Sequence, residues 1–186
     1  GDASKYLWAK RSCRAWSGTS AAWAGGGGAQ GSLLPCGSAY ADNVHTWMVY
    51  GPFSLEGATR AALDVRLWAN TVSGQDSVSL MASTDREQFY GLGLSGNSGG
   101  WVAQRFDLTN VHKLGNLAGK SGLWIAIVFD SDPSGSLPEG AYVDDIHLWK
   151  SSDGVAPPLA TGAAGATGAA APGLSVQPAR GTLPPQ

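Results

Sequence analysis

Charged side chains are scarce in this chain, and the two signs are mixed. Lys, Arg, Asp and Glu make up 14% of its 186 residues, 14 of them acidic and 12 basic. No run of basic residues occurs, so we expect no nucleic-acid partner, because phosphate binding needs clustered Lys and Arg. Long apolar runs are missing as well. The longest, residues 123–129, is far short of the roughly 20 residues that cross a bilayer, so no membrane span is expected.

Cysteine is also rare, with only Cys13 and Cys36. An isolated pair that closes a loop of this size predicts a disulfide and therefore an oxidising compartment. Two free, buried thiols in a cytosolic protein are the alternative. A composition low in charge and rich in Trp, Gly, Ser and Thr is typical of an extracellular all-β module, so we expect a secreted or cell-surface location.

Short segments in which apolar and polar residues alternate recur along the chain, and none shows a sustained helical period. Gly- and Ser-rich turns separate them, and the four glycines at 25–28 should break regular structure. This pattern predicts an all-β, antiparallel β-sandwich of the jelly-roll type. The expected strands are residues 20–24, 47–50, 61–70, 77–83, 89–94, 101–108, 123–129 and 142–149.

The composition changes after Lys150, which predicts a sandwich domain over residues 1–150 and an extended tail over residues 151–186. The tail is almost entirely Ala, Gly, Pro, Ser and Thr. Such a chain buries too little side-chain area to fold alone, so one interpretation is a flexible linker. The other is an intersubunit connector that pairs with the sheet edge of a neighbouring copy, with Leu174 and Val176 filling small pockets.

Two adjacent carboxylates, Asp144 and Asp145, stand in the middle of the last expected strand. Strict alternation places Tyr142, Asp144 and Leu148 on one face and Asp145 on the other. One Asp should then face the core, where it must be paired or bound to a cation. We therefore weigh a structural Ca²⁺ at these residues against ordinary solvated carboxylates, with catalysis a distant third.

Catalytic motifs are missing from the sequence. The three histidines lie in separate segments without zinc-peptidase spacing. Ser98 stands in a Gly-Asn-Ser-Gly-Gly run, but a nucleophile elbow needs a strand-to-helix turn, and this serine falls in an expected hairpin loop. We predict that the protein is not an enzyme.

Eight tryptophans are present, and most should lie in the core. Trp68 and Trp101 are the two that an outer sheet face could present for stacking on sugar rings. Core packing is the alternative for both.

The order of several segments resembles the jelly-roll modules of secreted bacterial peptidases of the immune inhibitor A type, and is similar to MAM-like and carbohydrate-binding jelly rolls. The likeness covers about residues 8–149 and rests on residues 47–55, 62–68, 82–85, 100–108 and 142–146. It implies a non-catalytic extracellular module, often with a structural Ca²⁺ near the last strand, which points to Asp144 or Asp145. The peptidase domain has no counterpart here.

Two functions follow as hypotheses. The first is a structural subunit that self-assembles into a filament or surface assembly through its tail. The second is a carbohydrate-binding or adhesion module of a larger secreted protein. Tail contacts with another copy would favour the first, and an exposed aromatic face with polar neighbours would favour the second.

Overall fold

The computed structural model describes residues 5–159 and 173–184. Ten strands and one short helix, α1 (Gly28–Gly31), lie in this part of the chain, and none of its helices is long and apolar enough to span a membrane. The strands are β1 (Leu7–Arg11), β2 (Ala21–Gly27), β3 (His45–Phe53), β4 (Arg60–Asn70), β5 (Ser77–Ser83), β6 (Gln88–Gly96), β7 (Val102–Asp107), β8 (Leu123–Asp130), β9 (Gly140–Ser151) and β10 (Leu174–Thr182).

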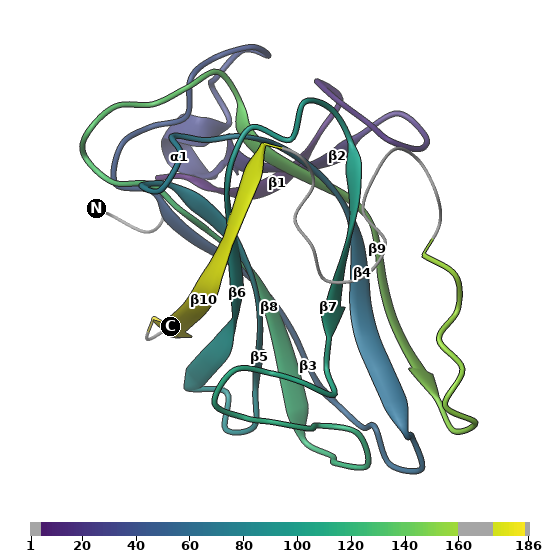
Figure 1. Ribbon diagram of the computed structural model, residues 1–186. Helices are drawn as coiled ribbons and strands as arrows, with labels where there is room; N and C mark the ends of the chain where they lie inside the picture. The colour runs from purple at the N-terminus through teal and green to yellow at the C-terminus, as the bar shows by residue number, and fades with distance from the viewer. Residues whose placement is uncertain (1–4, 160–172, 185–186) are drawn as a thin grey trace.

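The strands form two five-stranded sheets that pack face to face (Figure 1). Sheet I has the order β1-β2-β9-β4-β7, and sheet II the order β10-β6-β5-β8-β3. All the strand pairs are antiparallel. The prediction of an all-β, antiparallel β-sandwich is confirmed.

The main core lies between the sheets and follows the period-two alternation of the sequence. In β4, Leu63, Val65 and Leu67 are buried in this core, while the residues between them face outward. β8 is buried on both faces, as its continuous apolar run predicts, because Ile127 packs between the sheets and Val128 packs on the outer face of sheet II.

The four-glycine segment does not interrupt β2, contrary to expectation, and Gly25–Gly27 continue the strand. Glycine is needed in this part of β2 because neighbouring atoms leave no room for a Cβ. A Cβ on Gly26 would lie 2.8 Å from both Arg11 and Trp23, and one on Gly27 would lie 2.7 Å from Ala9. The glycines allow close packing against β1 rather than forming a turn.

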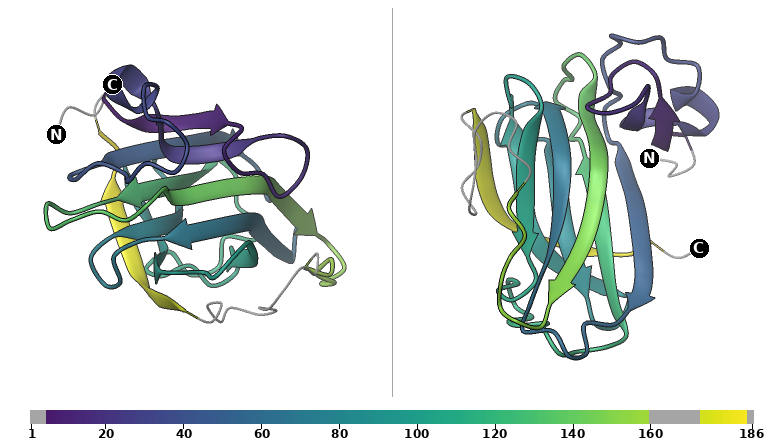
Figure 2. Two further views of the ribbon diagram at one scale, coloured as in Figure 1. Left: turned by 90° about the horizontal axis from the view of Figure 1, so that it is seen from above. Right: turned by 90° about the vertical axis from the view of Figure 1, so that its right-hand side faces the viewer.

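The two sides of the sandwich differ. On one side, Trp8 of β1 joins the sheets by donating its backbone N–H to Thr46 Oγ1 and its indole N–H to Thr46 O of β3, both at 3.2 Å. On the other side lie the outermost strands β7 and β10, and in the described residues each pairs with one neighbour only. Figure 2 shows β10 on the side of the sandwich away from β1.

The expected tail needs a correction at its C-terminal part. Residues 174–182 form β10, which pairs over its whole length with β6 of the same chain, from Leu174 opposite Gly96 to Thr182 opposite Gln88. These residues therefore belong to the sandwich, and β9 runs on to Ser151. Leu174 gives the segment an apolar side chain that packs in the inter-sheet core. Residues 160–172 and 185–186 of the expected tail lie outside the described residues.

Candidate functional site

A groove of about 740 Å³ lies between the sheets on the side of β7 and β10. The polar residues in its lining are Arg60, Arg105, Asp107, Asn110, His112 and Gln177. Most of its other lining is apolar and is supplied by Leu92, Phe106, Pro157, Leu159, Val176 and Pro178. Within the described ranges, β7 and β10 each have one unpaired edge. A partly apolar groove between two such edges can hold an extended segment, because the edges offer backbone N–H and C=O groups and the lining offers apolar contacts.

One wall of the groove, residues 156–159, is fixed by a polar network on the outer face of sheet I. Arg105 of β7 donates from Nε and Nη2 to Asp64 of β4, at 2.7 and 2.6 Å. Arg105 Nη2 also donates to the Pro157 carbonyl at 3.0 Å, and the Trp149 indole N–H donates to Asp64 Oδ2 at 2.9 Å. The hydrogen bond with Asp64 raises the pKa of Arg105 above its ordinary value.

The two predicted tail-contact residues have different environments. Leu174 is buried in this chain's own inter-sheet core, whereas Val176, 43% exposed, lines the groove. Leu174 therefore anchors β10 in its own sheet, whereas Val176 is one of several exposed β10 residues.

Asp144 and Asp145 both lie outside the core, which corrects the prediction that one of them faces inward. β9 has a bulge here, since Arg66 pairs with Asp144 while Asp64 pairs with His147, so two residues of β9 oppose one of β4. Asp145 has a φ of 42°. The bulge shifts the alternation, so Leu148 packs against the inter-sheet core rather than sharing the outer face with Tyr142.

The two carboxylates bind the turn that follows β1. Asp144 Oδ2 accepts the backbone N–H groups of Trp16 and Ser17, at 2.8 and 3.1 Å, and Asp145 Oδ1 accepts the Ser17 hydroxyl at 2.6 Å. In the described part of the chain, no three His, Cys, Asp or Glu side chains gather in a way that could hold a metal ion. A structural Ca²⁺ at Asp144 and Asp145 stays a prediction.

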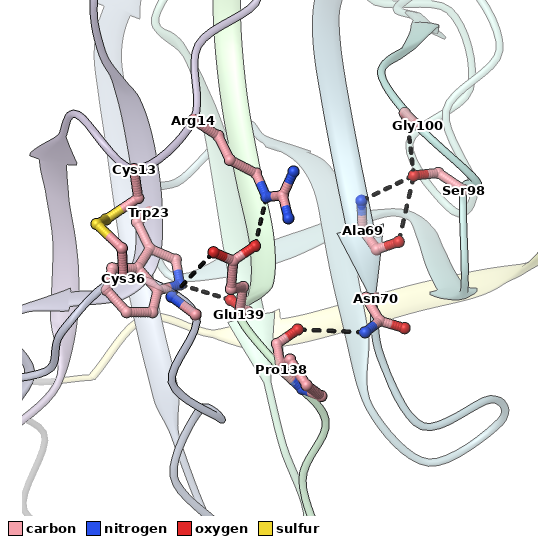
Figure 3. A network of polar contacts seen from close by, with 11 residues as sticks. Cys13, Arg14, Trp23, Cys36, Ala69, Asn70, Ser98, Gly100, Pro138 and Glu139 are labelled. Carbon is pink, nitrogen blue, oxygen red and sulfur yellow. Dashed lines mark hydrogen bonds and ion pairs between the residues drawn. A yellow bond between two sulfur atoms is a disulfide. The ribbon is translucent and has the colours of Figure 1, made fainter.

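Cys13 and Cys36 form a disulfide, as predicted, with their Cα atoms 5.3 Å apart (Figure 3). The bond ties the loop after β1 to the loop after α1. Beside it, Glu139 is 6% exposed, and its carboxylate binds Arg14 Nε and accepts the Gly37 N–H at 3.0 Å. The Glu139 carbonyl accepts the Trp23 indole N–H. The sequence gives no signal for this role of Glu139, because its partners are far away along the chain.

Trp68 and Trp101 belong to an aromatic cluster on the outer face of sheet I. Trp68 meets Tyr142 edge to face at 5.8 Å, and the Arg14 guanidinium lies 3.9 Å from its ring centroid. Trp101 is half-buried against the same cluster, which also contains Trp23. Both side chains therefore have packing partners, and sugar stacking at either residue stays a prediction.

The Ser98 hydroxyl bridges backbone groups of Ala69 and Gly100 (Figure 3). Its hydroxyl accepts the Ala69 N–H at 2.9 Å and lies 3.2 Å from Ala69 O and 2.6 Å from Gly100 O. The residue is 7% exposed. These bonds connect the loop before β7 to the end of β4, and all three are made with backbone groups.

A second polar cluster, which the sequence did not reveal, lies on the outer face of sheet II. His45 Nδ1 binds Asp130 Oδ1, and the Trp47 indole N–H donates to His45 Nε2 at 2.7 Å. The Trp47 ring packs against Phe89, and a Cβ on Gly181 of β10 would lie 2.8 Å from that ring. Trp47 thus connects β3 to the far end of β10.

Comparisons with protein-family models, with curated proteins and with solved structures found no match to this chain. The resemblance to immune inhibitor A-type modules therefore stays a prediction.

Proposed function

We propose that this protein is a non-catalytic extracellular structural subunit that self-assembles through its C-terminal strand, into a filament or a surface assembly. The observation that carries the proposal is the position of β10. It is a nine-residue strand at the edge of sheet II, and only β6 pairs with it in the described residues. The edge of β10 that no described residue pairs with offers backbone hydrogen-bonding groups to another molecule.

Several features support the remaining parts of the proposal. A disulfide fits an oxidising, extracellular compartment. The Ser98 hydroxyl is engaged by backbone groups, and His45 by Asp130 and Trp47, which fits structural rather than catalytic roles. The order β2-β9-β4-β7 facing β3-β8-β5-β6 supports the jelly-roll topology, because it matches a pair of Greek keys wound together.

The test uses two matched variants of β10. Leu174→Asp places a charge in the inter-sheet core, where Leu174 is 8% exposed, so β10 should detach because burying an unpaired charge is costly. Ser175→Asp adds the same charge at the next, exposed position. Sedimentation velocity should show assemblies for the natural chain and for Ser175→Asp, and monomers for Leu174→Asp. A natural chain that is strictly monomeric at high concentration, or Leu174→Asp assemblies like those of the natural chain, would refute the proposal.

Carbohydrate binding is the second candidate, and one aromatic pair favours it. Tyr50 is 63% exposed and its ring is stacked on Phe53, with centroids 6.2 Å apart and planes at 19°. An exposed, stacked pair on the edge strand β3 is a better sugar platform than Trp68, whose ring Arg14 already contacts. Affinity electrophoresis through polysaccharide gels should retard the natural chain and not Tyr50→Ala. Equal mobility of the two in all the gels would exclude this site.

A further inference from the structure

The Trp47 side chain joins a titratable group to the C-terminal end of β10. Its indole N–H donates to His45 Nε2 at 2.7 Å. Its ring packs on β10, because a Cβ on Gly181 would lie 2.8 Å from Cη2 and 2.9 Å from Cζ2 of the indole. The same ring meets Phe89 of β6 edge to face, with centroids 5.4 Å apart. A movement of the indole therefore changes the packing at the end of β10.

The protonation state of His45 decides whether Trp47 keeps its hydrogen bond. His45 Nδ1 binds Asp130 Oδ1, so the neutral ring carries its proton on Nδ1 and the Nε2 lone pair accepts the Trp47 N–H. In the protonated ring both nitrogens carry hydrogen. Nε2–H then faces another donor, and the indole N–H loses its acceptor. Since the Asp130 carboxylate favours the protonated ring, protonation strengthens one contact of His45 and breaks the other.

Few other charges lie on the strands around His45. β3, β5, β6 and β8 contain one Asp, Glu, Lys or Arg between them, which is Asp130. Of the tyrosines in these strands, Tyr90 packs against the inter-sheet core, and Tyr50 stacks on Phe53. Within sheet II, the charge of the imidazole is therefore balanced by a single carboxylate.

The two other strands that approach this region carry charges with other surroundings. β10 has Arg180, which points away from the outer face of sheet II because its neighbour Ala179 packs on that face. β1 contacts β3 through the buried Thr46. Of the charged residues of β1, Lys10 is exposed, and Arg11 donates to three backbone carbonyls near α1. The titration of the imidazole is therefore governed by its two hydrogen-bonding partners.

We propose that protonation of His45 releases the Trp47 indole and loosens the C-terminal end of β10, so that this end opens more readily in acid than at neutral pH. The other end of β10 stays in place, because Leu174 is buried in the inter-sheet core. The two ends of the strand therefore respond differently to pH. This inference concerns the docking of β10 in its own sheet and does not depend on self-assembly.

Hydrogen exchange followed by NMR reports on each end of β10 separately. The Leu183 N–H donates to the Glu87 carbonyl just after β10, and the Asn97 N–H donates to the Gly173 carbonyl just before it, both at 3.0 Å. Protection factors, which correct for the intrinsic pH dependence of exchange, are compared at pH 5 and pH 8.

Three variants accompany the natural chain. His45→Gln carries no charge at either pH. Trp47→Phe keeps an aromatic ring beside β10 but removes the indole N–H. His147→Gln is the matched control, because it makes the same change as His45→Gln at an exposed position on sheet I.

In the natural chain and in His147→Gln, we expect the Leu183 amide to be about three- to tenfold less protected at pH 5 than at pH 8, the range that loss of one hydrogen bond allows. Protection of the Asn97 amide should be equal at the two pH values. In His45→Gln and Trp47→Phe, protection of the Leu183 amide should not depend on pH. The inference is overturned by a pH-independent Leu183 amide in the natural chain, by an equal loss at Asn97, or by persistence of the loss in either variant.

Sedimentation velocity of the natural chain at the same two pH values separates this inference from the proposed function. If the chain assembles while protection of the Leu183 amide is independent of pH, only the inference fails. If the Leu183 amide loses protection in acid while the chain is monomeric at both pH values, the inference stands and self-assembly fails.

Discussion

Asp64 and Arg105 form a two-pronged ion pair across β4 and β7, with side chains only 14% and 17% exposed. An ion pair that is joined by two hydrogen bonds and is mostly shielded from solvent stabilises a protein more than a typical surface ion pair does. Asp64→Asn keeps the shape of the side chain but removes its charge and one acceptor. We expect it to lower the free energy of unfolding by about 1–3 kcal/mol and to loosen residues 156–159, because Arg105 also binds the Pro157 carbonyl.

Urea denaturation measures the first effect, and limited proteolysis within residues 153–160 the second. Asp42→Asn changes an exposed residue and serves as the control. Equal stability and equal cleavage rates for Asp64→Asn and Asp42→Asn would mean that the ion pair does not support the groove wall.

Two buried tyrosines should respond in opposite ways to loss of the hydroxyl. Tyr40 Oη donates to Asp76, which is fully buried, and accepts the Val72 N–H at 3.2 Å. Among the described residues, Tyr142 Oη is a buried oxygen without a hydrogen-bond partner. Tyr40→Phe should therefore lower the free energy of unfolding by about 1–3 kcal/mol, while Tyr142→Phe should be neutral or stabilising. Thermal melts of the two variants decide this, and a larger loss for Tyr142→Phe would contradict it.

The sequence predicted the parts of the fold that follow from period-two alternation and missed those that depend on long-range contacts. The faces of β4 and β5 follow the pattern because neither strand is interrupted. The faces of β9 do not, because the bulge at Asp145 shifts the register. Likewise, β10 pairs with a strand some eighty residues earlier, and its short, Pro-containing segment gives little local signal.

The candidate site was predicted only in part. The disulfide follows from there being just two cysteines, and Val176 does line the groove. The groove itself requires knowing that β7 and β10 end up on the same side of the sandwich, which no local pattern shows. The His45–Asp130 contact joins positions 85 residues apart, so it too becomes visible only when β3 and β8 pair.

The disulfide should contribute measurably to stability. Cys13 and Cys36 close a loop with a sequence separation of 23, for which the chain-entropy relation gives about 3 kcal/mol. Replacing both with Ser should lower the melting temperature by several degrees, and reductant should then have no further effect. Intact-mass analysis after alkylation without reduction should show no modified thiol. Two alkylated cysteines in that sample would contradict the disulfide.

Calcium binding at Asp144 and Asp145 can be tested against their contacts with the turn at Trp16 and Ser17. If Ca²⁺ binds there, EGTA should lower the melting midpoint and added Ca²⁺ should restore it, because a ligand that binds only the folded state stabilises it. Asp145→Asn should abolish that response. A midpoint that is unchanged in both conditions would assign both carboxylates to holding the turn.

His45 should make stability depend on pH through its contact with Asp130. The hydrogen bond with Asp130 raises the pKa of His45, and partial burial opposes this rise. A histidine whose pKa is raised on folding adds stability below the ordinary value of about 6.5, and this contribution is lost as the pH rises through the folded pKa. Asp130→Asn removes the charged partner, so the difference in melting temperature between the natural chain and this variant should be larger at pH 5 than at pH 8.

The Trp47 indole should have the opposite effect to Asp130 on the pKa of His45. Its N–H donates to His45 Nε2, and this bond needs the lone pair that protonation would occupy. Trp47→Phe should therefore raise the pKa of His45 further, whereas Asp130→Asn should lower it. Imidazole proton chemical shifts followed by NMR between pH 4 and 9 measure both changes. Identical titration of His45 in the natural chain and Asp130→Asn would show that the contact does not control protonation.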